Sequence, residues 1–367
     1  MTRKELNLAI FEKTTDKVLW QPRLETWIGH YMGQDTMPAR FEGMDNFAIY
    51  DELRCSIRYA ASAGIEAYNE PNDIAHATEQ RDDEFIETFT TPTGTITRVY
   101  KDIWIDGKLK NRRIHGWPIE SPDDLRVLID IVERTQFRAN VEAFEAAAAR
   151  VAHRAEPTVF LNSSGYTELI KFWSGLPNCC YLEADDPDLM MAYVKACDDR
   201  DMRQAEAALG LPCRIHNLGD HTTNEFTPPR ILEKYVMPKW QRISEFLHSH
   251  GRFVHSHWDG NSATILPMLK DTGLDSVESL TPEPQCDMTL EMIAEHTGDM
   301  VLLDLIPAIF FLDQYSTEFI VDFTKRVIDM FGGRLVLGIS DEISQVGEID
   351  KVWAITELVD EVCGLAD

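Results

Sequence analysis

The stretch Pro228–Trp258 reads PPRILEKYVMPKWQRISEFLHSHGRFVHSHW and combines two patterns that together indicate the fold. Residues Pro228–His250 carry apolar side chains on one helical stripe, which is typical of an amphipathic helix packed on a core. The members of this stripe are Ile231, Leu232, Tyr235, Val236, Trp240, Ile243, Phe246 and Leu247. Residues Arg252–Trp258 then form a short run that is typical of a strand. A helix followed by such a strand predicts one unit of a parallel α/β sheet.

The same alternation of short strands and longer helices extends through most of the chain. The predicted strands are Val18–Arg23, Gly64–Asn69, Thr158–Asn162, Cys213–Leu218, Arg252–Trp258, Asp275–Leu280, Met300–Leu305 and Arg334–Ile339. Further predicted helices are Pro187–Leu209, Thr317–Phe331 and Asp350–Val362. Eight strands, mostly followed by helices, predict a (β/α)8 barrel of the TIM type that occupies residues 1–367 as one domain.

Residues from about 70 to 155 depart from this rhythm. Phe85–Trp117 has the alternation of a β-hairpin, with a turn at Thr91–Gly94 and a second turn at Asp106–Gly107. Val141–Arg154 is rich in alanine and predicts a helix. We therefore expect a hairpin-containing insertion between the second and third strands, which forms a lid or subdomain of the barrel.

Composition excludes several classes of function. With 35 Lys and Arg against 62 Asp and Glu the net charge is −27, which disfavours nucleic-acid binding. No run of about 18 uncharged apolar residues is present to span a membrane. The N-terminal residues are polar and lack the apolar region of a signal peptide, so we expect a cytoplasmic protein. The seven cysteines are scattered, with no CxxC pair, and predict neither disulfides nor an all-cysteine zinc site.

The end of the strand Arg252–Trp258 carries a candidate metal site. Side chains at positions i, i+2 and i+4 of a strand share one face, so His255, His257 and Asp259 are expected to point together. Glu278 ends the next predicted strand and offers a further oxygen ligand. Two imidazoles and carboxylates suit a divalent metal, zinc first, and an open coordination position would make the site catalytic. Alternatively, the histidines satisfy backbone carbonyls or bind an acidic substrate.

Other polar residues also collect at predicted strand ends, where a barrel enzyme has its active site. Asp341 and Glu342 are candidates for proton transfer or for the metal, although adjacent acids also cap helices. His216 is either a functional or a hydrogen-bonded interior histidine. The candidates for substrate binding are Arg23, Asn162, Trp27 and Trp258, the tryptophans as walls of a pocket for an aromatic substrate.

These residues resemble the uroporphyrinogen decarboxylase superfamily, whose members fold as distorted (β/α)8 barrels. The resemblance rests on His255–Asn261 (HSHWDGN), Leu266–Leu269 (LPML), Thr272–Asp275 (TGLD), Thr281–Pro284 (TPEP) and the strand end Leu337–Asp341 (LGISD). The decarboxylases carry an arginine-rich first loop that holds the carboxylates of the substrate. Gln21–Trp27 keeps one arginine here, which argues against a porphyrinogen substrate.

The other branch comprises zinc-dependent methyltransferases that exchange methyl groups with a corrinoid on a partner protein. Their His-x-Cys zinc pattern corresponds to His257 and Asp259 here, and no thiol stands near Ile339 and Ser340, where a distal cysteine is expected. Harder ligands favour an oxygen substrate over a thiolate. The resemblance implies zinc-assisted transfer of a methyl group from a small O-methyl donor, such as a methoxylated aromatic, to the cobalt of a corrinoid protein docked at the barrel mouth.

In that reaction Asp341 or Glu342 would move a proton, while His216 and Asn162 would orient the substrate. Two alternatives remain open at this point. One is a metal-free lyase, like uroporphyrinogen decarboxylase, that acts on a carboxylated substrate. The other is a corrinoid-binding or scaffold protein without catalytic activity.

Overall fold

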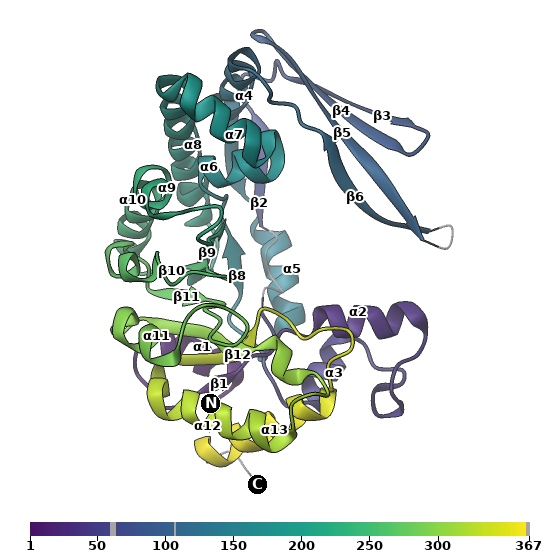
Figure 1. The fold of residues 1–367 in the computed structure, drawn as a ribbon, viewed down its shortest axis with the longest axis vertical. Coiled ribbons are helices and arrows are strands. Elements are labelled where there is room, and N and C mark those ends of the chain that lie inside the picture. Colours follow the sequence, from purple (N-terminus) through teal and green to yellow (C-terminus); the bar gives the residue numbers. More distant parts are fainter. Residues whose placement is uncertain (59–63, 106–107, 365–367) are drawn as a thin grey trace.

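The computed structural model describes residues 1–58, 64–105 and 108–364, and its centre is a parallel sheet of seven strands (Figure 1). In spatial order the strands are β1 (Leu19–Trp20), β13 (Leu335–Ser340), β12 (Val301–Pro307), β11 (Ser276–Glu278), β10 (Phe253–His257), β9 (Ile215–His221) and β8 (Thr158–Phe160). Every neighbouring pair is parallel. The predicted α/β class and seven of the eight predicted strands are therefore confirmed.

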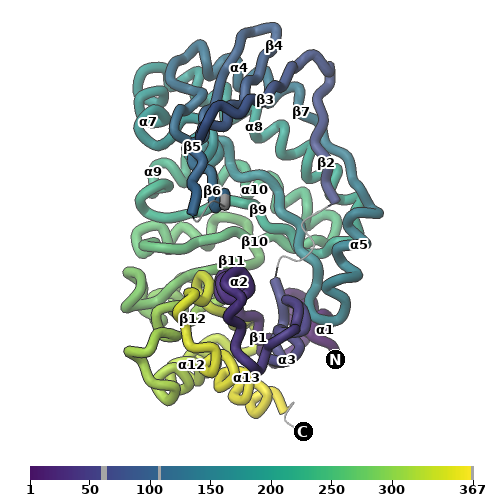
Figure 2. Tube along the Cα trace, turned by 90° about the vertical axis from the view of Figure 1, so that its right-hand side faces the viewer, coloured from purple at the N-terminus to yellow at the C-terminus, as the bar shows by residue number. Residues whose placement is uncertain are grey.

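The predicted second strand is not part of this sheet, so the described residues do not form a complete eight-stranded barrel. Gly64–Asn69 was expected beside the first strand, but β2 (Ile65–Asn69) pairs antiparallel with β7 (Thr135–Ala139) instead (Figure 2). β2 is at most half-buried along its length, which does not suit a strand inside a barrel.

A different segment, Cys55–Arg58, lies at the open edge of β1. The Ser56 N–H donates to the carbonyl of Trp20 at 2.8 Å, and the Ser56 hydroxyl donates to the carbonyl of Arg154, shortly before β8. Cys55–Arg58 therefore lies between the two ends of the sheet. All four side chains are buried, as expected for an inner strand, but a run of four residues containing serine and arginine gives no strand signal.

Helices cover the outside of the sheet, and their amphipathic faces form the main core. They are α1 (Arg3–Phe11), α8 (Pro187–Ala208), α10 (Met237–His248), α11 (Leu290–Thr297), α12 (Thr317–Phe331) and α13 (Ile349–Cys363). Of the four helices predicted outside the insertion, three thus appear at nearly the predicted bounds. The fourth, Pro228–His250, is divided into α9 (Pro229–Ile231), the π-helical η3 (Leu232–Val236) and α10. Pro238 causes an interruption here because it has no N–H to donate.

The insertion projects from the sheet as an antiparallel arm. Its strands are β3 (Ala75–Arg81), β4 (Glu84–Thr91), β5 (Gly94–Ile105) and β6 (Lys108–Gly116), followed by α4 (Pro122–Arg134), β7 and α5 (Val141–Val151). The predicted hairpin with its turn at Thr91–Gly94 corresponds to β4 and β5. The predicted turn at Asp106–Gly107 lies outside the described residues. A second apolar cluster, with Ile96, Leu128 and Tyr193, joins the arm through α4 to α8.

The shorter elements connect these parts. They are α2 (Glu25–Gln34), α3 (Asn46–Glu52), α6 (Gly165–Glu168), the π-helical η2 (Leu169–Ser174), α7 (Gly175–Asp185) and the 3-10 turns η1 (Ala39–Phe41), η4 (Leu266–Asp271), η5 (Ala308–Phe311) and η6 (Gly332–Arg334). No helix in the described part of the chain combines the length and apolar character needed to cross a bilayer.

Candidate metal centre

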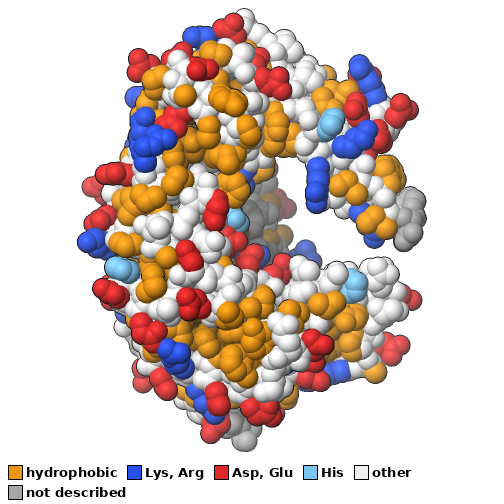
Figure 3. All heavy atoms as spheres, in the orientation of Figure 1, with side chains coloured by type: hydrophobic (Ala, Val, Ile, Leu, Met, Phe, Trp, Pro, Cys, Tyr) orange, Lys and Arg blue, Asp and Glu red, His pale blue; other side chains and the backbone are white. Residues whose placement is uncertain are grey.

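The carboxyl ends of the parallel strands meet at a cavity of about 260 Å³, which His221, His257, Glu278, Asp341 and Phe160 help to line. The space-filling view shows the molecule hollowed between the arm and its lower half, with acidic and histidine side chains inside the hollow (Figure 3). In parallel α/β proteins this end of the sheet is where functional groups gather.

Two side chains that line this cavity, His221 and His257, form a possible metal site together with Asp259. Each offers one ligand atom, and the three atoms lie within 4.8 Å of one another. His221 Nε2 lies 2.8 Å from Asp259 Oδ1, and His257 Nε2 lies 3.7 Å from Asp259 Oδ2. Tetrahedral zinc with ligands at about 2.0–2.2 Å requires ligand atoms about 3.3–3.6 Å apart. The donor set and its spacing therefore fit zinc after small side-chain shifts.

An irregularity in the β9–β10 pairing brings His221 to this site. Asn217 lies opposite His255, but His221 rather than Gly219 lies opposite His257. β9 therefore contributes two extra residues between these pairs. Gly219 has φ +65°, and a Cβ there would lie 2.4 Å from the carbonyl oxygen of Leu161, so the bulge requires glycine. The sequence does not indicate His221 as a ligand, because regular strand pairing predicts the wrong partner for His257.

The predicted ligands His255 and Glu278 lie behind this cluster. Glu278 Oε1 lies 2.8 Å from His257 Nδ1, and Glu278 Oε2 lies 3.4 Å from His255 Nδ1. Glu278 also accepts a hydrogen bond from the Asn217 amide at 3.2 Å. A carboxylate on the far nitrogen of a histidine fixes the ring and raises its basicity. Glu278 thus directs the Nε2 atom of His257 towards Asp259.

Electrostatics within the cluster are strongly coupled. Burial opposes the charge on His257, but its contacts with Asp259 and Glu278 prevail and raise its pKa to about 9. Burial likewise opposes the charges of Glu278 and Asp259, yet their histidine neighbours hold the pKa of each well below its ordinary value. The carboxylates are therefore charged at neutral pH, as metal binding requires, whereas His257 is protonated, so a metal that binds there would displace its proton.

Arg58 is a buried arginine close to Glu278, and it was not among the site residues predicted from the sequence. Arg58 donates two hydrogen bonds to Asp304, at 2.9 and 2.6 Å, and its Nη1 lies 3.6 Å from Glu278. Gln21 accepts a further hydrogen bond from Arg58 at 3.0 Å. Since buried charges persist only when paired, this network holds the acidic groups in place under the cavity.

The two acids after β13 have different surroundings. Asp341 lines the cavity, forms an ion pair with Arg23 and accepts a hydrogen bond from the Ser279 hydroxyl at 3.3 Å. Glu342 instead accepts hydrogen bonds from the backbone and hydroxyl of Thr26, at 2.9 and 2.7 Å. Thr26 is in the first turn of α2, so Glu342 caps this helix. Asp341 is the acid that the structure brings to the site.

The remaining predicted residues do not line the cavity. His216 is fully buried inside the sheet, and burial lowers its pKa to about 3. The Asn162 amide donates to the buried Asp201 at 2.9 Å. Trp27 donates to the carbonyl of Gly347 at 3.1 Å from within the core, and Trp258 is fully buried. The structure therefore does not bring these four side chains to the cavity wall.

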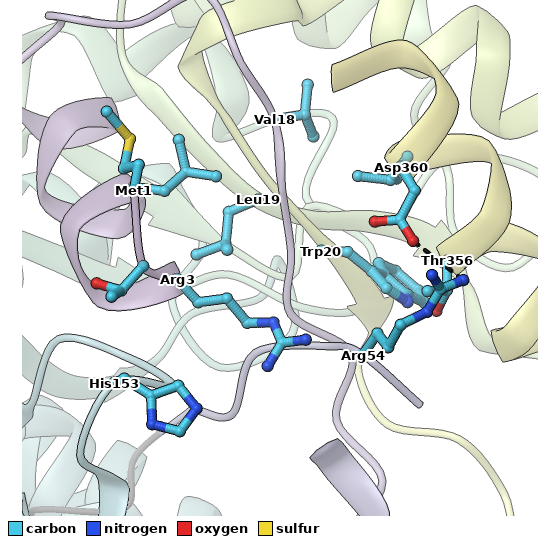
Figure 4. A pocket seen from close by; sticks show the side chains of 12 residues that line it. Met1, Arg3, Val18, Leu19, Trp20, Arg54, His153, Thr356 and Asp360 are labelled. Carbon is cyan, nitrogen blue, oxygen red and sulfur yellow. Dashed lines mark ion pairs between the residues drawn. The ribbon is translucent and has the colours of Figure 1, made fainter. Parts of the chain in front are cut away.

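A further cavity of about 320 Å³ lies away from the metal cluster, between the start of α1, β1 and α13 (Figure 4). Trp20, Arg3 and His153 line it, and Arg54 forms an ion pair with Asp360 at 3.1 Å beside them. None of the three cluster residues contributes to its wall. The possible metal site is therefore next to the cavity at the carboxyl ends of the strands, and not next to this second cavity.

Comparisons with known proteins identify the fold. No protein-family model and no curated protein matches the sequence. Among solved structures, a methyltransferase from Methanosarcina mazei matches 99% of this chain with 99% of its own, at 13% identity and a TM-score of 0.58. A putative vitamin-B12-independent methionine synthase from Listeria monocytogenes matches 60% of this chain with 69% of its own, at 12% identity and a TM-score of 0.39.

A muconate lactonizing enzyme from Pseudomonas fluorescens matches 83% of this chain with 79% of its own, at 13% identity and a TM-score of 0.29. The last two likenesses are too distant to support a conclusion. The first extends over the whole chain, and it agrees with the resemblance that the sequence indicated. The chain therefore has the fold of the Methanosarcina methyltransferase from end to end.

Proposed function

We propose that the protein is a methyltransferase that removes the methyl group from a small O-methyl substrate, with zinc held by His221, His257 and Asp259. The observation that supports this most is the three-ligand cluster at the mouth of a fold shared with a methyltransferase. Three protein ligands leave a coordination position open for a substrate, as in catalytic zinc sites. The acceptor we propose is the cobalt of a corrinoid, carried by a partner protein at the mouth.

Zinc bound there would supply a Lewis acid that stabilises negative charge on the ether oxygen as its bond to the methyl carbon breaks. A reduced corrinoid would supply the cobalt nucleophile. Glu278 keeps the His257 ring oriented throughout, and Arg58 together with Asp304 keeps Glu278 in place. Asp341, whose carboxylate Arg23 and Ser279 hold, would pass a proton from water to the departing oxygen.

The alternative of a decarboxylase for a porphyrin-like acid is less consistent with the cavity. A cavity of about 260 Å³ has room for a one-ring ligand, because an apolar cavity of about 150 Å³ already accommodates benzene. A polycarboxylate also needs several cations. Of the groups lining this cavity, Arg23 and Lys171 are the cationic side chains, and Arg23 is already paired with Asp341.

The test is metal content and activity in one preparation. Protein purified without added metal is analysed by plasma mass spectrometry and then incubated with a methoxylated aromatic and chemically reduced cobalamin. We expect about one zinc per chain and formation of methylcobalamin, both lost in His257→Ala. A protein that neither contains nor takes up zinc, or one that demethylates equally well without it, would exclude this mechanism.

A further inference from the structure

The end of the arm exposes three large apolar side chains, which we call the arm tip. They are Trp104, Ile105 and Leu109, with exposed fractions of 53%, 52% and 41%. Trp104 and Leu109 lie directly opposite each other in the pairing of β5 with β6, so their side chains share one face of the sheet. Exposed apolar groups rimmed by polar residues indicate interaction sites, and tryptophan is enriched among the residues that dominate protein interfaces.

The two strands that carry the arm tip are basic, although the chain is strongly acidic. Residues 94–116 contain six Lys and Arg against two Asp, a net charge of +4, whereas the whole chain has a net charge of −27. Lys110 and Arg113 of β6 are exposed, and in the part of the chain that the structure describes no carboxylate lies within ion-pair distance of either. The end of the arm therefore combines apolar side chains with uncompensated positive charge.

The stability of the arm does not account for Arg113. Arg113 lies directly opposite Lys101 in the pairing of β5 with β6, and like charges in this position destabilise a sheet. The acid nearest to this pair is already used, because Lys101 Nζ donates to Asp83 at 2.7 Å. A contact outside the arm is the better explanation for the charge of Arg113.

The surface on the other side of the hollow has the complementary character. Figure 1 and Figure 2 both place α2 opposite the end of the arm. Residues 25–52, which include α2 and α3, contain six acids against Arg40, a net charge of −5. Asp35 and Glu42 are exposed, and no Lys or Arg among the described residues lies within ion-pair distance of either. Met32 of α2 is 44% exposed. We call Met32, Asp35 and Glu42 the α2 rim.

The arm tip does not contact the α2 rim of its own chain. The space-filling view shows an open gap between the arm and the lower half of the molecule (Figure 3). Contacts at the base of the arm hold it in this position: Arg98 donates to the carbonyl of Phe172 at 3.0 Å and lies 4.8 Å from the ring of Trp173. The ring of Phe89 also contacts Trp173, at 5.7 Å. Closure of the gap would break these contacts, so a second molecule is the better source of acids for the arm.

We infer that two copies of this chain form a two-fold dimer in which the arm tip of each copy contacts the α2 rim of the other. Every contact in such an interface occurs twice, once on each side of the two-fold axis. The charge of the whole chain opposes association, but charges more than about 8 Å apart are largely screened at physiological salt, so the nearby opposite charges prevail. Neither the arm tip nor the α2 rim lines the metal cavity, so the inference is independent of the proposed function.

The first test is sedimentation equilibrium of the wild type, Trp104→Ser and, as a matched control, Tyr181→Ser. Tyr181 lies in α7, outside both surfaces, and is 67% exposed. We expect the wild type and Tyr181→Ser to dimerise equally and Trp104→Ser to dimerise about 30-fold more weakly, as for a dominant tryptophan of an interface. A wild type that stays monomeric overturns the inference. Cosedimentation of that monomer with phosphatidylserine vesicles would assign the arm tip to a membrane surface instead.

An exchange of charges tests whether these two surfaces meet. Lys110→Glu with Arg113→Glu reverses the charge of the arm, and Asp35→Lys with Glu42→Lys reverses the charge of the α2 rim. Each doubly substituted protein should be monomeric, because like charges then face each other. An equimolar mixture should form a heterodimer, because both of its interfaces again join opposite charges. Circular dichroism verifies that each variant is folded. Dimers of either variant alone, or folded variants whose mixture stays monomeric, overturn the inference.

Discussion

His221 and His257 face each other across the β9–β10 pair, with ring centroids 5.2 Å apart and planes inclined by 30°. Both rings approach Asp259, which follows β10. His255, two residues before His257 on the same strand, is 1% exposed and lies outside this group. Because of the bulge in β9, His221 rather than His255 lies beside His257 and Asp259.

This arrangement predicts that His221→Ala abolishes zinc binding while His255→Ala retains it. Removal of a direct ligand should lower zinc affinity by more than the 10–100-fold that loss of an outer partner typically costs. The measurement is zinc content by plasma mass spectrometry, followed by competition with a chelator. If His255→Ala loses the metal and His221→Ala keeps it, the ligand set predicted from regular strand spacing is the right one.

A second prediction concerns Glu278, which contacts His257 without belonging to the three-ligand cluster. Glu278→Gln keeps the shape of the side chain but removes the charge that orients His257. We expect zinc affinity to fall about 10–100-fold while some binding remains. Chelator competition gives the affinity. Complete loss of zinc would instead indicate that Glu278 is itself a ligand.

Much of the fold could be predicted from the sequence because its signals are local. Apolar spacing gave α8, α12 and α13 at nearly their final bounds, and seven strands of the sheet. The eighth was assigned to Gly64–Asn69, whereas Cys55–Arg58 lies beside β1. Cys55–Arg58 is too short to show a hydrophobic periodicity. Its position in the fold depends on contacts with residues that are distant in the sequence, such as Arg154.

Part of the candidate metal site could also be predicted, because some of its signals are local in the sequence. His257 and Asp259 follow from spacing along one strand. His221 depends on the bulge at Gly219, and the glycine itself was the one local signal for it. The pairing of Arg58 with Asp304 joins residues from opposite ends of the chain, and no periodicity reports such a contact. Tertiary charge networks of this kind become visible only in the folded structure.

His216 provides a prediction about pH. Burial lowers its pKa in the folded protein to about 3, whereas the unfolded chain should have a pKa of about 6.5. The unfolded state therefore binds one more proton between these values, and the stability due to neutral His216 is lost as pH falls below about 6.5. Between pH 7 and pH 5 the loss should be about 2 kcal/mol.

The variant His216→Asn has no titrating group at this position and should lack that component. Urea unfolding of both proteins at pH 7 and pH 5 gives the difference. Its zinc content should match the wild type, since His216 lies outside the metal cluster. An identical pH dependence in the two proteins would show that His216 is already accessible to protons in the folded state.

Gly219 offers the most direct test of how the backbone builds the site. Gly219→Ala introduces a Cβ 2.4 Å from the Leu161 carbonyl at φ +65°, so β9 must shift, and His221 with it. We expect a loss of stability of about 1–3 kcal/mol or more, together with loss of zinc.

Gly298→Ala is the matched control, because Gly298 has φ +48° with nothing within 4 Å of its Cβ position. That variant should lose about 1–3 kcal/mol through backbone strain and keep its zinc. Thermal unfolding and metal analysis of both variants distinguish the effect of backbone strain from the effect of moving His221. Equal zinc content in the two variants would mean that the bulge does not position His221.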